Sequence, residues 1–326
     1  MCFFFRRKLP EFNSIEELFN NITEELKSHI QIEKIELPYS NFDVKSVFQN
    51  LNFVKKQRGK INHITGHVNY IALMTGKRTV LTIHDVKSAF YGNIFHQIII
   101  KTLMYWLPAI FVKKITVISN FSKIELESII PFAKSKIKVI YNPVGKLFQP
   151  KNYSFNAQYP TILCLGTKEN KNLERIIKSL NGMNCRLHII GKLSKDQLLL
   201  LDEYNTSYIN SFNLSQKEIV ASYESCDLLC FPSTYEGFGM PIIEAQAIGR
   251  PVVTSNIGAM LEIAENSACL VDPFDLESIR TGIENVVANE KYRNELIQRG
   301  FENIKKFQIE AIVDEYIKVY EDVLNS

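Results

Sequence analysis

Short apolar runs alternate with longer stretches of mixed polarity along most of the chain. Brief apolar runs bounded by polar or turn residues are typical of buried strands, and apolar positions three and four residues apart are typical of helices. We expect strands at Cys2–Phe5, 60–64, Thr79–Ile83, 114–119, 136–141, Thr161–Leu165, Arg186–Ile190, Leu228–Phe231 and 251–254. We expect helices from residue 14 onward and at 122–130, 172–180, 214–224, 279–307 and Ile309–Leu324. This alternation predicts an α/β fold with parallel sheets.

The pattern breaks after residue 141. Asn142-Pro143-Val144-Gly145 interrupts it, and a stretch rich in Pro, Asn and Ser continues to Pro160. Such clusters between periodic segments are typical of linkers. A chain of 326 residues can form two domains, each with its own core. We therefore predict one domain over 1–150 and a second over 151–309.

The two halves carry opposite net charge. Residues 1–150 contain 21 Lys and Arg against 11 Asp and Glu, and residues 151–326 contain 17 against 24, so balances of +10 and −7 sum to +3. This asymmetry indicates that the basic half meets an anionic surface or ligand, and lysines scattered in solvent are the alternative. No zinc-finger spacing, RNP-type motif or basic helical stripe points to nucleic acid. An anionic membrane surface fits better, and its leading contacts would be Arg6, Arg7, Lys8, Lys55, Lys56, Arg58 and Lys60.

The longest apolar stretch, 98–112, contains Lys101 and Pro108 and is too short to span a bilayer. It fits either a core helix or a helix at an interface. Apolar residues precede Arg6 and Arg7 at the N-terminus, which is the reverse of a signal peptide. The six cysteines form no C-x-x-C pair and most lie in apolar runs, as core thiols of a reducing compartment do. We therefore expect a cytoplasmic protein without disulfides or zinc.

Residues 227–273 carry the densest chemical signal. Glu236 and Glu244 stand eight positions apart around a glycine loop, Gly237-Phe238-Gly239, which follows an apolar strand. Pro241 suits the first turn of a helix and Gly249 its end. A glycine loop at a helix N-terminus presents free N–H groups to an anion such as phosphate, and the carboxylate of Glu244 can accept from hydroxyls. A turn between two strands with both glutamates in solvent is the alternative, because a lone Gly-x-Gly is a weak signal.

The whole of this segment resembles the donor-binding segment of retaining GT-B glycosyltransferases, the family-four group that uses nucleotide-sugars. The matching positions are Pro232-Ser233, Glu236 to Gly239, Pro241, Glu244-Ala245, Ala247, Gly249, Pro251 to Val253, Gly258, Glu262 and Asp272-Pro273. The resemblance implies two Rossmann-like parallel-sheet domains that face a cleft. The 1–150 domain would serve the acceptor, the 151–309 domain would bind the nucleotide-sugar, and a helix from about residue 310 would cross back to the first domain.

The resemblance also assigns roles to the donor-side residues. Glu236 would contact the sugar and orient the anomeric centre, and Glu244 would hold the ribose hydroxyls. The diphosphate would lie on the glycine loop opposite Lys171, with Lys168 as the near alternative. Lys171 matches the lysine of a Gly-x(n)-Lys-Asn-Leu loop. Gly166 and Thr167 open this loop, and many relatives carry an arginine where this chain has Thr167, so one phosphate contact departs from the pattern.

Fewer residues of the first half can be matched. His84 and Asp85 end a predicted strand, and ligand sites lie beyond the carboxyl ends of such strands. The pair resembles the family's His-Asp, in which the histidine faces the donor sugar. Ser119 and Asn142 end two further predicted strands, and His63, Gly66 and His67 are candidates for the acceptor side. Many members carry a Gly-Gly loop where this chain has Arg6 to Pro10, so the acceptor region is not transferable.

Motifs for other chemistries are missing from the sequence. It contains no G-x-G-x-x-G, Walker, H-E-x-x-H or G-x-S-x-G motif, and no Asp-x-Asp, the metal-binding mark of the other large glycosyltransferase fold. The resemblance implies a retaining hexosyltransferase, and the absence of Asp-x-Asp predicts that it needs no metal; we expect no cofactor. It would move a sugar from a UDP- or GDP-linked donor to a saccharide or lipid-linked acceptor in surface polysaccharide biosynthesis, at the inner face of the plasma membrane. A non-catalytic GT-B-like subunit that binds a nucleotide-sugar or regulates a partner is the alternative.

Overall fold

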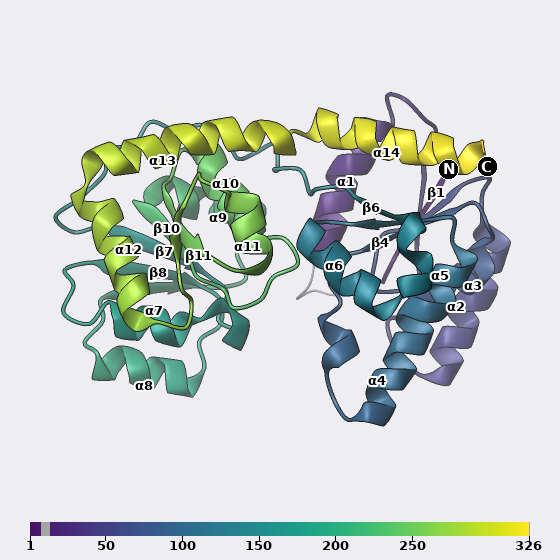
Figure 1. Cartoon of the computed structure of the whole chain (residues 1–326), viewed down its shortest axis with the longest axis horizontal. Helices are drawn as coiled ribbons and strands as arrows, with labels where there is room; N and C mark the ends of the chain where they lie inside the picture. Colours follow the sequence, from purple (N-terminus) through teal and green to yellow (C-terminus); the bar gives the residue numbers. More distant parts are fainter. Residues whose placement is uncertain (8–13, 326) are drawn as a thin grey trace. The chain divides into compact units, whose positions relative to one another are not determined.

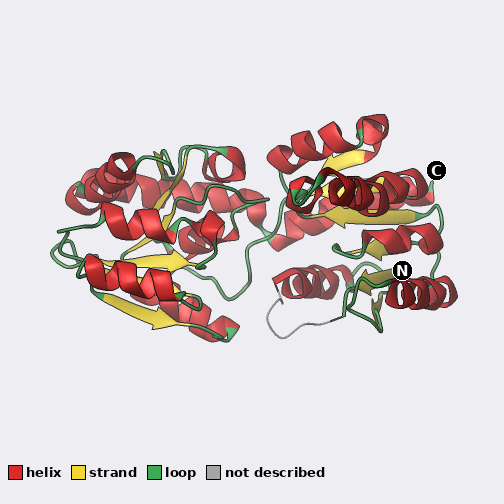
Figure 2. Ribbon diagram, turned by 90° about the horizontal axis from the view of Figure 1, so that it is seen from below, coloured by secondary structure: helices red, strands yellow, loops and turns green. Residues whose placement is uncertain are grey.

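The computed structural model describes residues 1–7 and 14–325 of the chain, so Lys8 of the expected membrane contacts lies outside the described residues. They form two compact units, 1–143 together with the residues from Ile309 onward, and Val144–Gln308 (Figure 1). Each unit is a parallel sheet with helices on both faces (Figure 2), which confirms the predicted fold class. The second unit begins before residue 150 because Val144 N donates to Phe307 O (2.9 Å) and the ring of Phe148 packs on that of Tyr223.

The N-terminal unit has a six-stranded sheet in the order β2-β1-β3-β4-β5-β6. Its strands are β1 (Cys2–Phe5), β2 (Glu33–Glu36), β3 (Asn62–Ile64), β4 (Thr79–Ile83), β5 (Lys114–Val117) and β6 (Ile137–Val139). Its helices are α1 (Ser14–Leu26), α2 (Val44–Gln57), α3 (Ala72–Thr75), α4 (Ile94–Lys101), α5 (Leu107–Phe111), α6 (Asn120–Ile129) and α14 (Ile309–Leu324).

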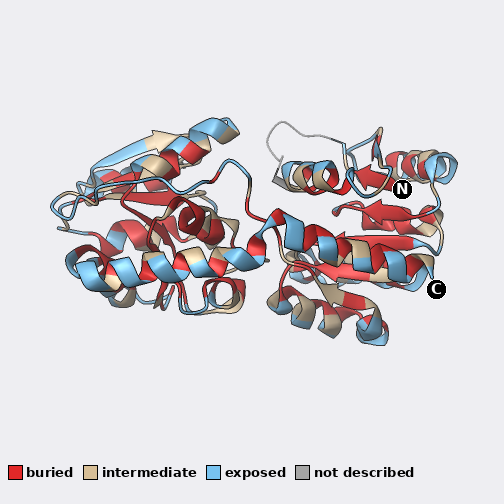
Figure 3. Ribbon diagram, turned by 90° about the horizontal axis from the view of Figure 1, so that it is seen from above, coloured by how far each residue is buried: buried red, intermediate tan, exposed pale blue. Residues whose placement is uncertain are grey.

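The first strand shows why an unbroken apolar run can be buried. Cys2 and Phe4 of β1 pack in the core on one face of the sheet, and Phe3 and Phe5 pack in the core on the other. A parallel strand covered by helices on both faces needs no polar side, and the inner strands of each sheet accordingly lie largely buried between their helices (Figure 3). Residues 312–320 of α14 join the second core beside α1. The C-terminal helix therefore belongs to the N-terminal unit, as predicted.

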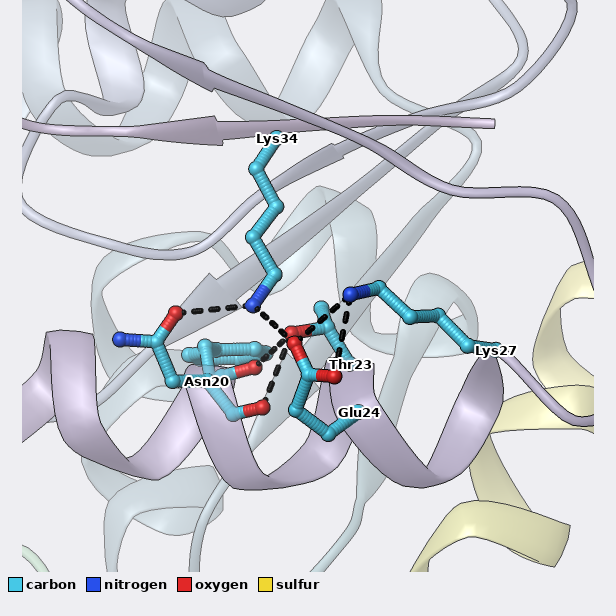
Figure 4. Close-up of polar contacts among 6 residues, drawn as sticks. Asn20, Thr23, Glu24, Lys27 and Lys34 are labelled. Carbon is cyan, nitrogen blue, oxygen red and sulfur yellow. Dashed lines mark hydrogen bonds and ion pairs between the residues drawn. The ribbon is translucent and has the colours of Figure 1, made fainter.

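Helix α1 is also tied to the edge strand β2 by polar contacts (Figure 4). The ammonium of Lys34 lies 3.0 Å from both Glu24 Oε1 and Asn20 Oδ1, and Lys27, in the turn just after the end of α1, also donates to Glu24. Hydrogen bonds from Lys27 and Lys34 lower the pKa of Glu24 to about 2. These contacts are exposed to solvent, so they orient α1 more than they stabilise it.

The C-terminal unit repeats the architecture with the strand order β12-β11-β10-β7-β8-β9. Its strands are β7 (Thr161–Leu165), β8 (Arg186–Ile190), β9 (Tyr208–Ser211), β10 (Leu228–Phe231), β11 (Val252–Ser255) and β12 (Cys269–Val271). Its helices are α7 (Leu173–Ser179), α8 (Lys195–Glu203), α9 (Gln216–Ser225), α10 (Met240–Ile248), α11 (Gly258–Ala264), α12 (Leu276–Ala288) and α13 (Glu290–Asn303). All six cysteines of the chain are buried and unpaired.

Three expectations about these elements were wrong. The single helix expected over 279–307 is two helices and a 3₁₀ turn, because Asn289 ends α12 and its side chain accepts from Tyr292 N to start α13. The strand expected over 114–119 ends at Val117, since Ser119 caps α6 by accepting from Ser122 N. For the apolar stretch at 98–112 the core-helix alternative was wrong, because only three residues of Ile94–Phe111 are buried, and the interfacial alternative stays open.

Candidate functional site

The glycine loop connects β10 to α10 in the C-terminal unit. Gly239 is the N-cap of α10 with φ of +108°, a backbone conformation that favours glycine, and it supplies no side chain to cap the helix. Pro241 occupies the first turn, and Gly249 ends the helix in the left-handed conformation. Phe238 is buried with its ring edge-on to Phe307, which holds the loop in place. Helix α10 thus begins at a glycine, whose backbone an anion can approach closely.

Lys171 and Glu236 meet directly beside this loop. Lys171 Nζ lies 2.6 Å from Glu236 Oε1, and both side chains are only partly exposed, 23% and 17%. The ammonium also lies over the ring of Phe231, 4.9 Å from its centroid. A partly buried ion pair is held more firmly than a surface one, because solvent screens it less. The structure therefore brings together a cation and a carboxylate that lie 65 positions apart in the sequence.

The loop that carries Lys171 is fastened to the end of β10. Asn170 Nδ2 donates to Tyr235 O at 2.9 Å and to Glu236 Oε1 at 3.2 Å, and Asn172 Nδ2 donates to Pro232 O and Pro273 O. Gly166 has φ of +86°, and a Cβ there would lie 2.8 Å from Lys171 Cγ. A side chain at position 166 would thus displace Lys171 from Glu236.

Glu244 has a buried hydrogen-bond donor. Tyr223 of α9 donates from its hydroxyl to Glu244 Oε2 at 2.6 Å. Burial raises the pKa of Tyr223 well above its usual range, and the neighbouring charge of Glu244 acts in the same direction. The hydroxyl therefore stays protonated and orients the carboxylate of Glu244. Glu244 lies in α10, about one turn beyond the glycine loop.

The other donor-side candidates differ in how they are held. Thr167 donates from its hydroxyl to Lys192 O at 2.8 Å, while its carbonyl accepts from Gln197. Lys168 is exposed at the start of the 3₁₀ turn that leads to Lys171. Of the two lysines, Lys171 is the better placed to meet an anion at the glycine loop, because its ammonium is already fixed on Glu236 beside that loop.

His84 and Asp85 follow β4 in the N-terminal unit. His84 Nε2 lies 2.7 Å from the carbonyl of Thr65, so this nitrogen carries the proton and Nδ1 is the acceptor. Burial lowers the pKa of His84 to about 3, and the imidazole is therefore neutral at physiological pH. Asp85 is partly buried and accepts from Lys87 N. Ser119 is fully buried and caps α6, which accounts for its position independently of any ligand.

The histidine one strand earlier is structural. His63 is fully buried, with Nδ1 2.7 Å from Tyr320 Oη and Nε2 2.7 Å from Thr82 Oγ1. Both ring nitrogens are thereby used within the unit, and burial lowers its pKa to about 3. The suggestion that His63 lines the acceptor side was therefore wrong.

The C-terminal unit matches a known protein family. Residues 146–303 fit the family model described as glycosyl transferases group 1, and the match contains Lys171, the glycine loop and both glutamates. The C-terminal unit therefore matches the group 1 glycosyl transferases over nearly its whole length. The two parallel six-stranded sheets with their helices match solved glycosyltransferase structures over nearly the whole chain and give the protein the GT-B fold.

Individual relatives agree with the group 1 assignment. The O-antigen chain mannosyltransferase RfbU of Salmonella typhimurium is 26% identical over 248 residues, which is 71% of this chain and 68% of RfbU. The uncharacterized glycosyltransferase MJ1178 of Methanocaldococcus jannaschii is 28% identical over 64% of this chain and 60% of its own length. The crystal structure of Anabaena Alr3699/HepE in complex with UDP and glucose has a TM-score of 0.77 at 14% identity, over 99% of this chain and 100% of that one. At that identity the likeness to HepE shows the fold alone.

Sequence reasoning missed two residues of the site. Tyr223 lies 21 positions before Glu244 on another helix, and nothing in the sequence marks its hydroxyl as the partner of that carboxylate. Asn170 belongs to the loop that was singled out for Lys171, but its link to Glu236 follows from the folded loop. Both residues hold a glutamate of the candidate site in position.

Proposed function

We propose that the protein transfers a hexose from a nucleotide-sugar to a saccharide or lipid-linked acceptor with retention of the anomeric configuration. The observation that carries the proposal is the Lys171–Glu236 pair, 2.6 Å apart, next to the glycine loop that begins α10. It places a cation, helix N–H groups and a carboxylate within one small region. A diphosphate linked to a sugar needs these groups, positive charge for the phosphates and acceptors for the sugar hydroxyls.

Each group has a role in the proposed reaction. The bond between the anomeric carbon and the diphosphate breaks, the acceptor oxygen bonds to that carbon on the same face, and its proton goes to the leaving diphosphate. Lys171 and the N–H groups of the α10 N-terminus stabilise the charge on the diphosphate. Glu236 uses Oε1 for Lys171 and Asn170 and keeps Oε2 for a sugar hydroxyl. Glu244, oriented by Tyr223, accepts from the ribose hydroxyls.

For the N-terminal unit, we keep His84, Asp85 and Ser119 as proposed contacts of the substrate. A neutral His84 with a proton on Nε2 can accept a hydrogen bond from a hydroxyl at Nδ1. It cannot act as a general acid at physiological pH. Its proposed contribution is therefore orientation of a sugar hydroxyl.

The relatives suggest the class of substrate. RfbU is named as an O-antigen chain mannosyltransferase, and the HepE structure contains UDP and glucose. We therefore propose a UDP- or GDP-linked hexose as donor and a growing surface polysaccharide or its lipid-linked precursor as acceptor. Such an acceptor, together with the basic first half of the chain, supports a cytoplasmic enzyme attached peripherally to an anionic membrane face.

The donor site is expected to bind a nucleoside diphosphate without a divalent cation. Lys171 and the helix N–H groups take the part that a metal ion plays elsewhere in neutralising phosphate. Calorimetry with UDP, GDP and ADP in excess EDTA should give a Kd for at least one of them that changes by less than about threefold when Mg²⁺ or Mn²⁺ replaces EDTA. Binding that appears only with the metal would overturn this account of charge neutralisation.

A further inference from the structure

The N-terminal unit carries an apolar helical segment that its own core leaves largely uncovered. The segment Ile94–Phe111 consists of α4, a π-helical turn over Thr102–Trp106, and α5. It has 18 residues, and within the described residues 1–7 and 14–325 it alone is long and apolar enough to cross a membrane by length and composition. Helix α4 projects away from the sheet (Figure 1). We call residues 94–111 the apolar segment.

One side of the apolar segment is anchored to the unit. Tyr105 and Ala109 are buried in the core, and Met104 packs against it. Asn69 Nδ2 donates to Met104 O at 2.8 Å, and Tyr105 Oη lies 2.9 Å from Ser88 Oγ. A segment fixed along one side in this way, with Lys101 in the middle and Pro108 near the end, is not arranged to be surrounded by lipid.

The opposite side is apolar and exposed. Ile94 and Phe95 are 77% and 73% exposed, so the fold of the unit covers little of either side chain. Exposed apolar residues recur at multiples of four positions across the π turn, at Ile94, Ile98, Trp106 and Ile110. Phe90, Tyr91, Ile99 and Phe111 extend the patch at its edges. A contiguous apolar patch on a soluble unit marks a surface that another body covers.

The charges around the patch indicate what that body is. The stretch 86–124, which contains the apolar segment, has five lysines and no acidic residue, and Asp85 and Glu125 flank it. Two of these lysines border the patch directly, Lys87 over the ring of Tyr91 and Lys101 over the ring of Phe90. A second copy of the chain would bring a like-charged face against this one, which opposes self-association. An anionic bilayer offers acyl chains to the apolar side and negative headgroups to the lysines.

We propose that the apolar segment lies in the interface of an anionic lipid bilayer, parallel to its plane, with Ile94, Phe95, Ile98 and Ile110 in the acyl region and Lys87 and Lys101 at the headgroups. This deepens the peripheral attachment suggested under the proposed function, because it names the inserting element and adds apolar insertion to electrostatic attraction. It does not depend on the chemistry of the donor site.

The single tryptophan of the chain makes the test local. Trp106 lies within the apolar segment and is partly exposed, so its emission reports on this segment alone. The full-length protein is mixed with vesicles of phosphatidylethanolamine and phosphatidylglycerol, and separately with neutral phosphatidylcholine vesicles. We expect a blue shift of the emission and quenching by brominated acyl chains with the anionic vesicles, and at least tenfold weaker partition into neutral ones. Unchanged emission with anionic vesicles, or equal partition into both, would overturn the proposal.

A pair of variants separates insertion of the apolar segment from non-specific hydrophobic adsorption to vesicles. The triple change Ile94→Ser, Phe95→Ser and Ile98→Ser should lower partition into anionic vesicles at least tenfold. The matched control, Leu198→Ser with Leu199→Ser, removes two exposed leucines from α8 in the other unit and should change partition less than twofold. Equal loss in both variants, or none in the triple variant, would contradict the assignment. So would a wild-type dimer in vesicle-free solution that the triple variant converts to monomer, since a second copy would then cover the patch.

Nucleotide binding keeps this test distinct from that of the proposed function. The triple variant should bind a nucleoside diphosphate with the wild-type Kd, because all three changes lie in the other unit from the glycine loop. If wild-type protein inserts into vesicles but binds no nucleotide, the proposed donor chemistry fails and the membrane inference stands. If nucleotide binding is intact and insertion is missing, the reverse holds.

Discussion

Replacing Glu236 with glutamine should lower the turnover of the nucleotide-sugar about a hundredfold while leaving the Kd of the nucleoside diphosphate unchanged or slightly lower. A charged hydrogen bond to the sugar contributes about 1.5–3 kcal/mol, and here it acts at the reacting centre. Glutamine keeps the shape of the side chain but no longer holds the ammonium of Lys171 by charge, so that ammonium becomes more available to phosphate. The measurement pairs steady-state kinetics with calorimetry on the same preparation.

Glu244→Gln is the matched control, since it makes the same chemical change eight positions away. It should weaken nucleoside diphosphate binding roughly ten- to a hundredfold and affect turnover at saturating donor much less, because the ribose is remote from the bond that breaks. Tyr223, which donates to Glu244, should hold the amide oxygen of the variant in place and preserve the fold. If Glu236→Gln weakened binding and Glu244→Gln reduced turnover, the two assignments would have to be exchanged.

The N-terminal unit should lose about 3 kcal/mol of unfolding free energy between pH 6.5 and pH 5.0. Burial lowers the pKa of both His63 and His84 to about 3, against about 6.5 in an unfolded chain. In this window the unfolded state binds the extra protons, so stability falls as the pH falls below 6.5 and continues to fall toward pH 3. For each histidine the dependence is about 0.7 kcal/mol per pH unit at pH 6.5, where the unfolded imidazole is half protonated, and approaches about 1.4 kcal/mol per pH unit at pH 5, and the two act in the same direction.

Trp106 lies in the N-terminal unit, so urea unfolding followed by its fluorescence at pH 7, 6 and 5 measures this effect. His84→Gln should reduce the pH dependence by about half, because the glutamine amide can donate to Thr65 O but cannot be protonated. The exposed His96→Asn is the control and should keep the full dependence. Stability that stays constant or rises on acidification would show that the two buried histidines are not held neutral.

Several elements of the fold could be predicted because local sequence decides them. β1 and β10 coincide with unbroken apolar runs, and β4, β7 and β8 with mostly apolar ones, since strands covered on both faces need no polar side. Elements decided by tertiary contacts were missed. β9 is a partly exposed edge strand without an apolar run, and the break between α12 and α13 depends on one capping side chain, that of Asn289.

The same distinction applies to the site and to the apolar segment. Spacing within 227–273 was enough to single out Glu236, Glu244 and the glycine loop, because a helix N-terminus and its first turns are local features. The contact of Lys171 with Glu236 and that of Tyr223 with Glu244 join residues that only the folded sheet brings together. Whether residues 94–111 are covered by the core also depends on the fold, and composition alone favoured a core helix over an interfacial one.

The most direct test of donor use is proton NMR of the full-length protein incubated with a panel of UDP- and GDP-hexoses. We predict that one donor releases its nucleoside diphosphate, that the first sugar product has the anomeric configuration of the donor, and that Glu236→Gln slows this release about a hundredfold. Nucleotide binding without release from any donor would contradict the enzyme and favour a non-catalytic binding subunit. A first product of the opposite anomeric configuration would contradict retention.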